Sequence, residues 1–142
     1  MKATEVVRCR GHPLVRGGHP TTFEVTKEAH LTAAGDCIIG IAADKGAADL
    51  SPAFRAALAR DDAIVRTRLS AGGVVIEIAG RGSSRMALDH PTDLVWRRSS
   101  FVCGRTVAIL CDRVAASLPR PLIDALSSGE QLLVEISCVT PD

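Results

Sequence analysis

The chain has no tyrosine and few other aromatic residues. Its aromatic residues are Phe23, Phe54, Trp96 and Phe101 in a total of 142 residues. Because unpaired bases are usually bound by stacking on aromatic rings, this scarcity argues against a stacking platform for nucleic acid. Apolar residues still make up 46% of the chain and charged residues 23%, which favours a folded protein with a buried core over a disordered one.

A large excess of one charge is also missing. The formal net charge of +1 excludes a strongly basic nucleic-acid-binding arm, although it leaves room for a local basic patch. Lysine is scarce, with three residues against fourteen arginines. Arginine is the better bidentate ligand for phosphate and carboxylate, but a GC-rich genome would also place arginines on any exposed surface.

Membrane-spanning segments and paired cysteines are absent as well. No apolar run approaches the length of a membrane-spanning helix, and the N-terminal stretch "MKATEVVRCRG" has no apolar signal region. The five cysteines are odd in number and none belongs to a CxxC pair. We therefore expect free thiols in a cytoplasmic protein with no membrane partner. The sequence leaves the oligomeric state open.

An internal repeat is the main feature that is present. The dipeptide RG begins at Arg10 and again at Arg81, and the triplet HPT begins at His19 and again at His90, both at an offset of 71 residues. After a gap of three residues, "IGIAADKGAADL" aligns with "VAILCDRVAASL" at an offset of 68. Ordered matches of this kind predict one domain over residues 1–142 that contains two copies of a unit, at about 4–70 and 75–139.

Each unit is predicted to contain three strands, a helix and a fourth strand. The strands are expected over 4–10, 21–26, 35–43 and 63–69 in the first unit, and over 73–80, 92–97, 105–111 and 131–139 in the second. Ser51 is predicted to cap the first helix, with Pro52 at its first position, and Pro121 takes the equivalent place in the second unit.

A unit of this size cannot bury its own apolar faces, so the two copies are expected to interleave. We predict an α+β fold in which two β-β-β-α-β units form a β-barrel-like domain with pseudo-two-fold symmetry and short helices at its ends. Closure into a barrel would remove exposed strand edges. An open sandwich of two sheets is the competing arrangement.

Two long motif strings carry a resemblance to a known family. These are "HPTTFEVTKEAHLTAAGDCIIGIAADKGAADL", preceded by "RGHP", and "HPTDLVWRRSSFVCGRT". With them the chain resembles an archaeal family of small conserved proteins that is classified only as domain of unknown function number three hundred seventy-one. The resemblance covers nearly the whole chain and implies an archaeal cytoplasmic protein. It implies no activity, substrate or catalytic residue.

The repeated motifs suggest a site for an anionic ligand. Arginine supplies charge and a two-pronged donor, glycine exposes backbone N–H groups, and histidine adds a pH-sensitive donor. We predict that a phosphorylated small molecule or nucleotide contacts Arg10, Gly11, His12, His19, Thr21, Lys45, Arg81, Gly82, His90, Thr92 and Arg113. The structural alternative is that the HPT triplets are two copies of one rigid turn, since proline holds the preceding residue in extended backbone.

Two other classes of function stay open at this point. A hydrolase would use His19, His90, Asp44 or Asp112 as catalytic groups, or a zinc ion held by His12, His19, His90 and Asp93, although HxH and HExxH spacings are absent. A nucleic-acid binder would depend on patch charge alone. Separately, Cys103 stands beside Gly104 and Arg105, a setting that lowers a thiol pKa.

Overall fold

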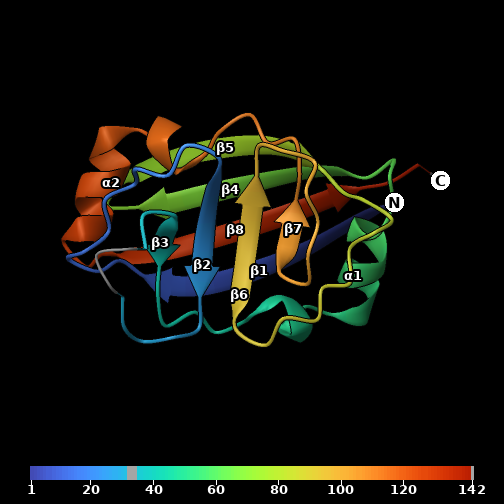
Figure 1. The fold of residues 1–142 in the computed structure, drawn as a ribbon, viewed down its shortest axis with the longest axis horizontal. Helices are drawn as coiled ribbons and strands as arrows, with labels where there is room; N and C mark the ends of the chain where they lie inside the picture. The colour runs from blue at the N-terminus through green and yellow to red at the C-terminus, as the bar shows by residue number, and fades with distance from the viewer. Residues whose placement is uncertain (32–34, 142) are drawn as a thin grey trace.

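A computed structural model describes residues 1–31 and 35–141, so residues 32–34 of the first predicted unit lie outside the described residues. The described chain forms two four-stranded sheets and two short α-helices (Figure 1). Sheet A has the order β1 (Lys2–Arg10), β8 (Gln131–Val139), β4 (Ile64–Ala71) and β5 (Val74–Arg81), with all neighbours antiparallel. Sheet B has the order β3 (Ile38–Gly40), β2 (Thr22–Thr26), β6 (Asp93–Arg97) and β7 (Thr106–Ala108).

The predicted α+β class is confirmed, and the residue alternation explains the strands. In β4, Val65, Thr67 and Leu69 are buried whereas Arg66 and Arg68 are exposed, as expected when successive side chains point to opposite faces of a sheet. Sheet A therefore has one apolar face and one solvated face. In sheet B, β2 and β6 pair antiparallel at the centre, and β3 and β7 add to them in parallel.

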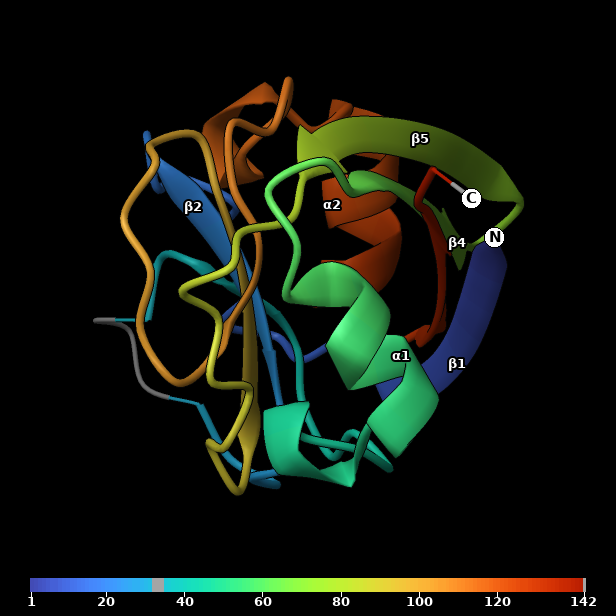
Figure 2. The ribbon, with the colours of Figure 1, turned by 90° about the vertical axis from the view of Figure 1, so that its right-hand side faces the viewer.

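The core lies between the two sheets, which pack as layers (Figure 2). The helices α2 and α1 lie at opposite ends of the molecule (Figure 1). On sheet B, the rings of Phe23 and Trp96 stack with centroids 4.7 Å apart. The indole Nε1 of Trp96 donates to Thr67 Oγ1 on sheet A at 2.8 Å. This hydrogen bond crosses the core, so the one buried polar group of the tryptophan is satisfied by the opposite layer.

The helices follow short 3-10 turns. Turn η1 (Ala47–Asp49) leads into α1 (Pro52–Leu58), and η2 (Ala115–Ser117) leads into α2 (Arg120–Ser127). The Ser51 hydroxyl accepts from the Phe54 N–H at 3.2 Å, which confirms the predicted cap. Helix α2 begins one residue earlier than predicted, at Arg120. Within the described residues the helices contain seven and eight residues, far short of the ~20 that a membrane crossing needs.

The expected closed barrel is wrong for the described chain, because the strands divide into two separate sheets. Strands β3 and β7 are also shorter than the predicted runs 35–43 and 105–111. Just beyond them, Ala42 and Leu110 adopt positive φ angles of 53°, a conformation that ends a strand. Only single bridges, Arg10 with Ile41 and Arg81 with Ile109, connect the sheets at these corners.

Candidate functional site

The three His-Pro segments form local turns. In both HPT triplets the histidine Nδ1 accepts hydrogen bonds from the second and third N–H groups that follow it. For His19 these donors are Thr21 and Thr22, each at 3.2 Å, and for His90 they are Thr92 at 3.3 Å and Asp93 at 3.0 Å. Each imidazole thus holds the backbone that leads into a strand, in the manner of an Asx turn.

The two HPT turns lie at opposite ends of one strand pair. Strands β2 and β6 are antiparallel, with Thr22 opposite Arg97 and Thr26 opposite Asp93. The His19 turn precedes β2 and the His90 turn precedes β6, so four residue steps of about 3.3 Å separate them by roughly 13 Å. The sequence left open whether the two HPT turns converge, and the structure places them at opposite ends of this strand pair.

The candidate zinc ligands His12, His19, His90 and Asp93 do not form a recognisable metal-binding group in the described residues. In the described part of the chain, no group of three or more His, Cys, Asp and Glu side chains lies close enough to hold a metal ion. His12 Nδ1 accepts from the Leu14 N–H at 3.0 Å, and so belongs to a third local turn. Of the four candidate ligands, His90 and Asp93 lie close together, with Nε2 and Oδ2 3.9 Å apart.

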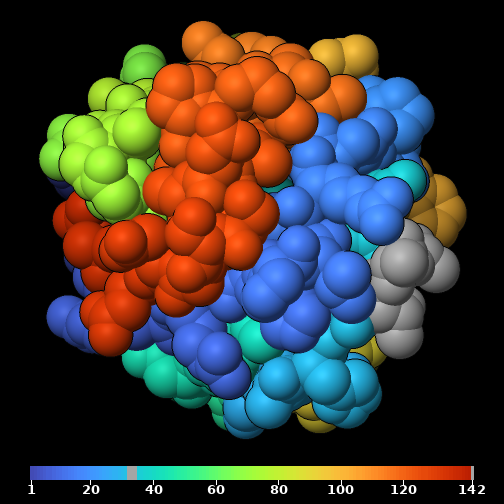
Figure 3. Space-filling model, turned by 90° about the vertical axis from the view of Figure 1, so that its left-hand side faces the viewer, coloured from blue at the N-terminus to red at the C-terminus, as the bar shows by residue number. Residues whose placement is uncertain are grey.

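The glycines of the RG dipeptides lie against helix ends. A Cβ on Gly11 would collide with the carbonyl oxygen of Leu126 at the end of α2, and a Cβ on Gly82 with that of Leu58 at the end of α1. Figure 3 shows the segment that follows β1 packed against α2 at this end of the molecule. Close backbone approach, which only glycine permits, accounts for both repeated glycines.

The repeated Asp and basic residues also make structural contacts. Asp44 Oδ1 accepts from the Arg8 N–H at 3.0 Å, and Asp112 Oδ1 accepts from the Ala79 N–H at 2.9 Å, so each carboxylate pairs with an edge strand of sheet A. Lys45 Nζ donates to Val6 O and Glu5 Oε1, and Arg113 donates to Ser117 O.

The arginines of the RG dipeptides lie on the outer face of sheet A, among other cations. Strand alternation places six basic side chains there, which we call the basic face: Lys2, Arg8, Arg10, Arg66, Arg68 and Arg81. Two acidic side chains, Glu77 and Glu135, share it. The net charge of the basic face is therefore +4. Since the whole chain has a net charge of +1, the rest of the chain is negative overall.

The cations of the basic face have no partners within residues 1–31 and 35–141. None of the six side chains makes a hydrogen bond or ion pair there, and all six residues are exposed. In contrast, Arg97 on β6 and Arg105, just before β7, each donate two side-chain hydrogen bonds. Unpaired cations held on rigid strands create a positive potential that an anion would relieve.

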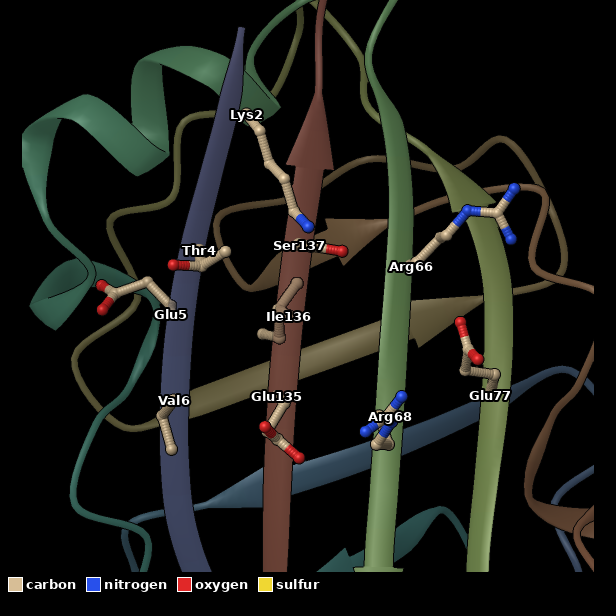
Figure 4. A pocket seen from close by; sticks show the side chains of 10 residues that line it. All are labelled: Lys2, Thr4, Glu5, Val6, Arg66, Arg68, Glu77, Glu135, Ile136 and Ser137. Atoms are coloured by element: carbon tan, nitrogen blue, oxygen red, sulfur yellow. The ribbon is translucent and has the colours of Figure 1, made fainter.

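A cavity of about 360 Å³ opens at the centre of the basic face. Figure 4 shows the side chains of Lys2, Ser137, Arg66 and Arg68 around it, on three neighbouring strands. The hydroxyl of Thr4 is a further polar group in its lining, and the acidic residues Glu5, Glu77 and Glu135 also line it. The volume lies at the lower end of the range for small-molecule sites, about 300–1,000 Å³.

Sheet B carries a second polar group of residues on its outer face, which sequence reasoning missed. Arg105 Nη1 donates to Glu24 Oε1 at 2.8 Å and to Asp93 Oδ2 at 3.0 Å, joining β2 and β6. Cys37 Sγ donates to Glu24 Oε2 at 3.1 Å. Burial raises the pKa of Glu24 to about 7, assisted by the Asp93 carboxyl and opposed by Cys37 and Arg105.

Its neighbour Asp93 stays ionised. Burial alone would raise the pKa of Asp93, but hydrogen bonds from Glu24, Thr26, Thr92 and Arg105 outweigh burial and hold the pKa below its usual range. The two carboxyl groups therefore titrate apart: Glu24 titrates near neutral pH, whereas Asp93 is charged there. The alternation of Phe23, Glu24 and Val25 in the sequence could have indicated that Glu24 faces away from the core, but not that Asp93 and Arg105 would meet it.

Cys103 lies beside this group and has an unusually acidic thiol. Thr106 Oγ1 accepts from Arg97 Nε at 2.9 Å and from the Cys103 N–H at 3.1 Å, so its hydroxyl hydrogen is free to point at Cys103 Sγ, 3.6 Å away. Partial burial raises the pKa of Cys103, but hydrogen bonds from the Arg105 backbone, Thr106 and Arg97 lower it to about 7. This confirms the direction predicted from the sequence.

Comparison with known proteins supports the resemblance seen in the motifs. An uncharacterised protein of the archaeon Methanocaldococcus jannaschii is 37% identical over 131 residues, which cover 92% of this chain and 96% of that protein. The family described as "Domain of unknown function (DUF371)" matches residues 7–139, from the second half of β1 to the end of β8. The chain therefore belongs to the family described as Domain of unknown function (DUF371).

Proposed function

We propose that this protein binds an anionic, phosphorylated small molecule or nucleotide in the cavity at the centre of the basic face. The observation that carries the proposal is the set of unpaired cations, Lys2, Arg66 and Arg68, around a cavity of ligand size. The class of ligand is the one predicted from the sequence. Its location is different, because the His and Gly residues of the repeated loops hold turns and helix contacts.

The spacing of the polar groups suits a phosphate. Arg66 and Arg68 are two residues apart on β4, so their Cα atoms lie about 6.7 Å apart and both side chains can reach one phosphoryl group. Ser137 is the register partner of both Thr4 and Arg66, which places two hydroxyls in the same row of the sheet. Hydroxyls and guanidinium groups together supply the donors that phosphate oxygens need.

The carboxylates in the lining favour a nucleotide over inorganic phosphate. Glu135 is the register partner of Arg68, and Glu77 pairs with Arg68 on its other side. A simple anion would be repelled by these two groups. A nucleotide carries ribose hydroxyls and base amino groups, which can donate to carboxylates while its phosphates contact the cations.

Calorimetric titration with adenosine triphosphate at low salt tests this proposal. We expect the double variant R66A/R68A to bind at least ~10-fold more weakly than the unchanged protein, since charge-assisted hydrogen bonds contribute about 1.5–3 kcal/mol each. The matched control is R16A/R98A, which removes two exposed arginines away from the basic face. Equal affinities for both variants would contradict the proposal, as would the absence of binding to the unchanged protein.

We further propose that the chain is one domain of two interleaved copies, at about 4–70 and 75–139. The carbonyl of His19 accepts from the Ala116 N–H, and that of His90 accepts from the Ala48 N–H, both at 3.0 Å. Each HPT turn thus contacts the 3-10 turn of the other unit. Reciprocal contacts of this kind explain the repeated motifs without a ligand.

We also propose a cytoplasmic location. All five cysteines have free thiols, and three of them, Cys9, Cys111 and Cys138, are buried. Free thiols persist in reducing compartments, whereas oxidising ones promote disulfides. Labelling with a thiol reagent under denaturing conditions, immediately after rapid lysis, would count the free thiols, and five labels per chain are expected.

A further inference from the structure

We infer that the basic face binds the sugar–phosphate backbone of a single-stranded nucleic acid, without preference for base sequence. This inference rests on the proposed function, because it identifies the phosphate-bearing ligand as one link of a polymer. Its basis is the arrangement of the cations beyond the cavity. Arg8, Arg10 and Arg81 lie outside the cavity of Figure 4 but on the same face of sheet A.

The register of sheet A places five arginines in a diagonal file. Arg10 and Arg8 lie near one end of β1, and Arg8 shares a row with Ser70 through Leu133. Moving from Ser70 toward the start of β4, the next two rows contain Arg68 and then Arg66. The row after them contains Arg81, which lies on β5 opposite Ile64 of β4. The file Arg10, Arg8, Arg68, Arg66, Arg81 therefore runs from one corner of the face to the other.

The file is too long for a small anion. From the row of Arg10 to the row of Arg81 there are eight residue steps along the strands and three strand spacings across them. With about 3.4 Å per residue and about 4.8 Å per strand, the corners lie roughly 30 Å apart. A mononucleotide can contact only part of this length, whereas a single strand of several nucleotides can span it, as with site sizes of about 4–16 nucleotides in other folds.

The five arginines form a single file, with Lys2 alone to one side in the row of Arg81, and this favours one phosphate row. A duplex presents two rows of phosphates on the two sides of each groove, which a single file cannot match. None of the four aromatic residues belongs to the strands of sheet A, so base stacking contributes nothing on this face. Recognition by charge alone is independent of sequence and strongly dependent on salt.

The two carboxylates on the basic face predict that a charge-removing substitution will increase the affinity for a strand. Glu77 and Glu135 flank Arg68 in the middle of the file and repel a phosphate bound there. Removing their charge should therefore strengthen binding of a strand. If these carboxylates instead accepted hydrogen bonds from a base or ribose of the bound strand, removing their charge would weaken binding of the strand.

The experiment is fluorescence anisotropy of a dye-labelled oligothymidylate of about 20 nucleotides, titrated at several salt concentrations. With five phosphate contacts, the logarithm of the association constant should fall with the logarithm of the salt concentration at a slope of about −3.5, since each contact contributes about −0.7 for single strands. The variant R10A/R81A should bind the strand at least ~5-fold more weakly, with a slope less steep by about 1.4. The variant E77Q/E135Q should bind it more tightly, and R16A/R98A should match the unchanged protein.

The outcomes separate this inference from the proposed function. If adenosine triphosphate binds and depends on Arg66 and Arg68, but R10A/R81A leaves the strand's affinity and salt slope unchanged, the inference is overturned and the proposed function stands. Tighter binding of a duplex than of the single strand, or a strong preference among oligomers of different base, would also overturn it. If neither adenosine triphosphate nor the strand binds, both fall. Circular dichroism of each variant checks that the fold is intact.

Discussion

At the scale of single residues, identical thiols acquire different chemistry from their surroundings. Cys103 is half-buried and accepts from Arg97 Nη2 at 3.3 Å, which stabilises its thiolate. Cys37 is also half-buried but faces Glu24, and burial together with that carboxyl raises the pKa of Cys37 to about 12. Burial likewise raises the pKa of Cys9 and Cys111 to about 12. Nucleophilic reactivity should follow these differences, because the thiolate is the reactive form.

We therefore expect iodoacetamide at pH 7 to alkylate Cys103 at least ~10-fold faster than any other cysteine, because about half of its thiol is ionised there. Peptide mass spectrometry over time measures the rates. Replacing Arg97 with alanine should slow the reaction severalfold at pH 7 and little at pH 9, where the thiol ionises without help. The R98A variant is the matched control. Equal rates for Cys103 and Cys37 would contradict this account.

At the scale of elements, the repeated RG dipeptides determine how strands meet helices. Gly11 follows β1 and Gly82 follows β5, and each lies against the last carbonyl groups of a helix. The Gly11 N–H donates to Glu130 O at 2.8 Å, and the Gly82 N–H donates to Ala63 O at 3.1 Å. The contact of Gly11 with Leu126 joins the end of β1 to α2, and that of Gly82 with Leu58 joins the end of β5 to α1.

Substitution by alanine should destabilise both junctions. We expect G11A and G82A each to lower the free energy of unfolding by about 2–4 kcal/mol, since the added Cβ meets backbone that cannot yield. Urea denaturation measures the change. Gly18 is the control, because a Cβ there would have neighbours no closer than 3.8 Å, so G18A should change stability by under ~0.5 kcal/mol. Comparable losses for all three variants would show that the helix contact is not the cause.

At the scale of the whole molecule, the pair of carboxyl groups in sheet B links stability to pH. The pKa of Glu24 is raised to about 7 in the folded chain from an ordinary value of 4.5. Between these two values the folded state binds more protons than the unfolded state, so stability falls as pH rises. Asp93, with its lowered pKa, acts in the opposite direction and only in acid, where stability is lost as pH falls below its unfolded pKa.

The free energy of unfolding should thus decrease from pH 5 to pH 8 by on the order of 3 kcal/mol on account of Glu24. The variant E24Q should lack this decrease, because its amide keeps the oxygen that accepts from Arg105 but does not ionise. Urea denaturation at each pH measures both curves, with E130Q, at an exposed glutamate, as the control. Parallel curves for E24Q and the unchanged protein would refute the assignment.

Much of the fold could be predicted from local patterns. The alternation in "AIVRTRL" and "QLLVEISCV" predicted β4 and β8, and the Ser51-Pro52 pair predicted the start of α1. The lengths of the short strands β3 and β7 were overestimated, because the backbone turns at Ala42 and Leu110, which are residues that rarely adopt a positive φ angle. The division into two sheets depends on these turns, so barrel closure could not be judged from the sequence.

The candidate site was less accessible to prediction. Arg10 and Arg81 were identified, but through a motif whose glycines and histidines serve the backbone. Alternation alone indicates that Arg66 and Arg68 point outward. It does not indicate that β8 inserts between β1 and β4 and so places the arginines of both strands in one diagonal file.

The sequence by itself indicated the family, most strand and helix positions, the Ser51 cap and the repeated motifs, because each depends on neighbouring residues or on matches along the chain. Only the tertiary structure decided which charges share a surface. The basic face and the Glu24–Asp93–Arg105 group join residues far apart in sequence, and such pairings follow from burial of the whole core between two sheets. Local propensity carries no information about that choice.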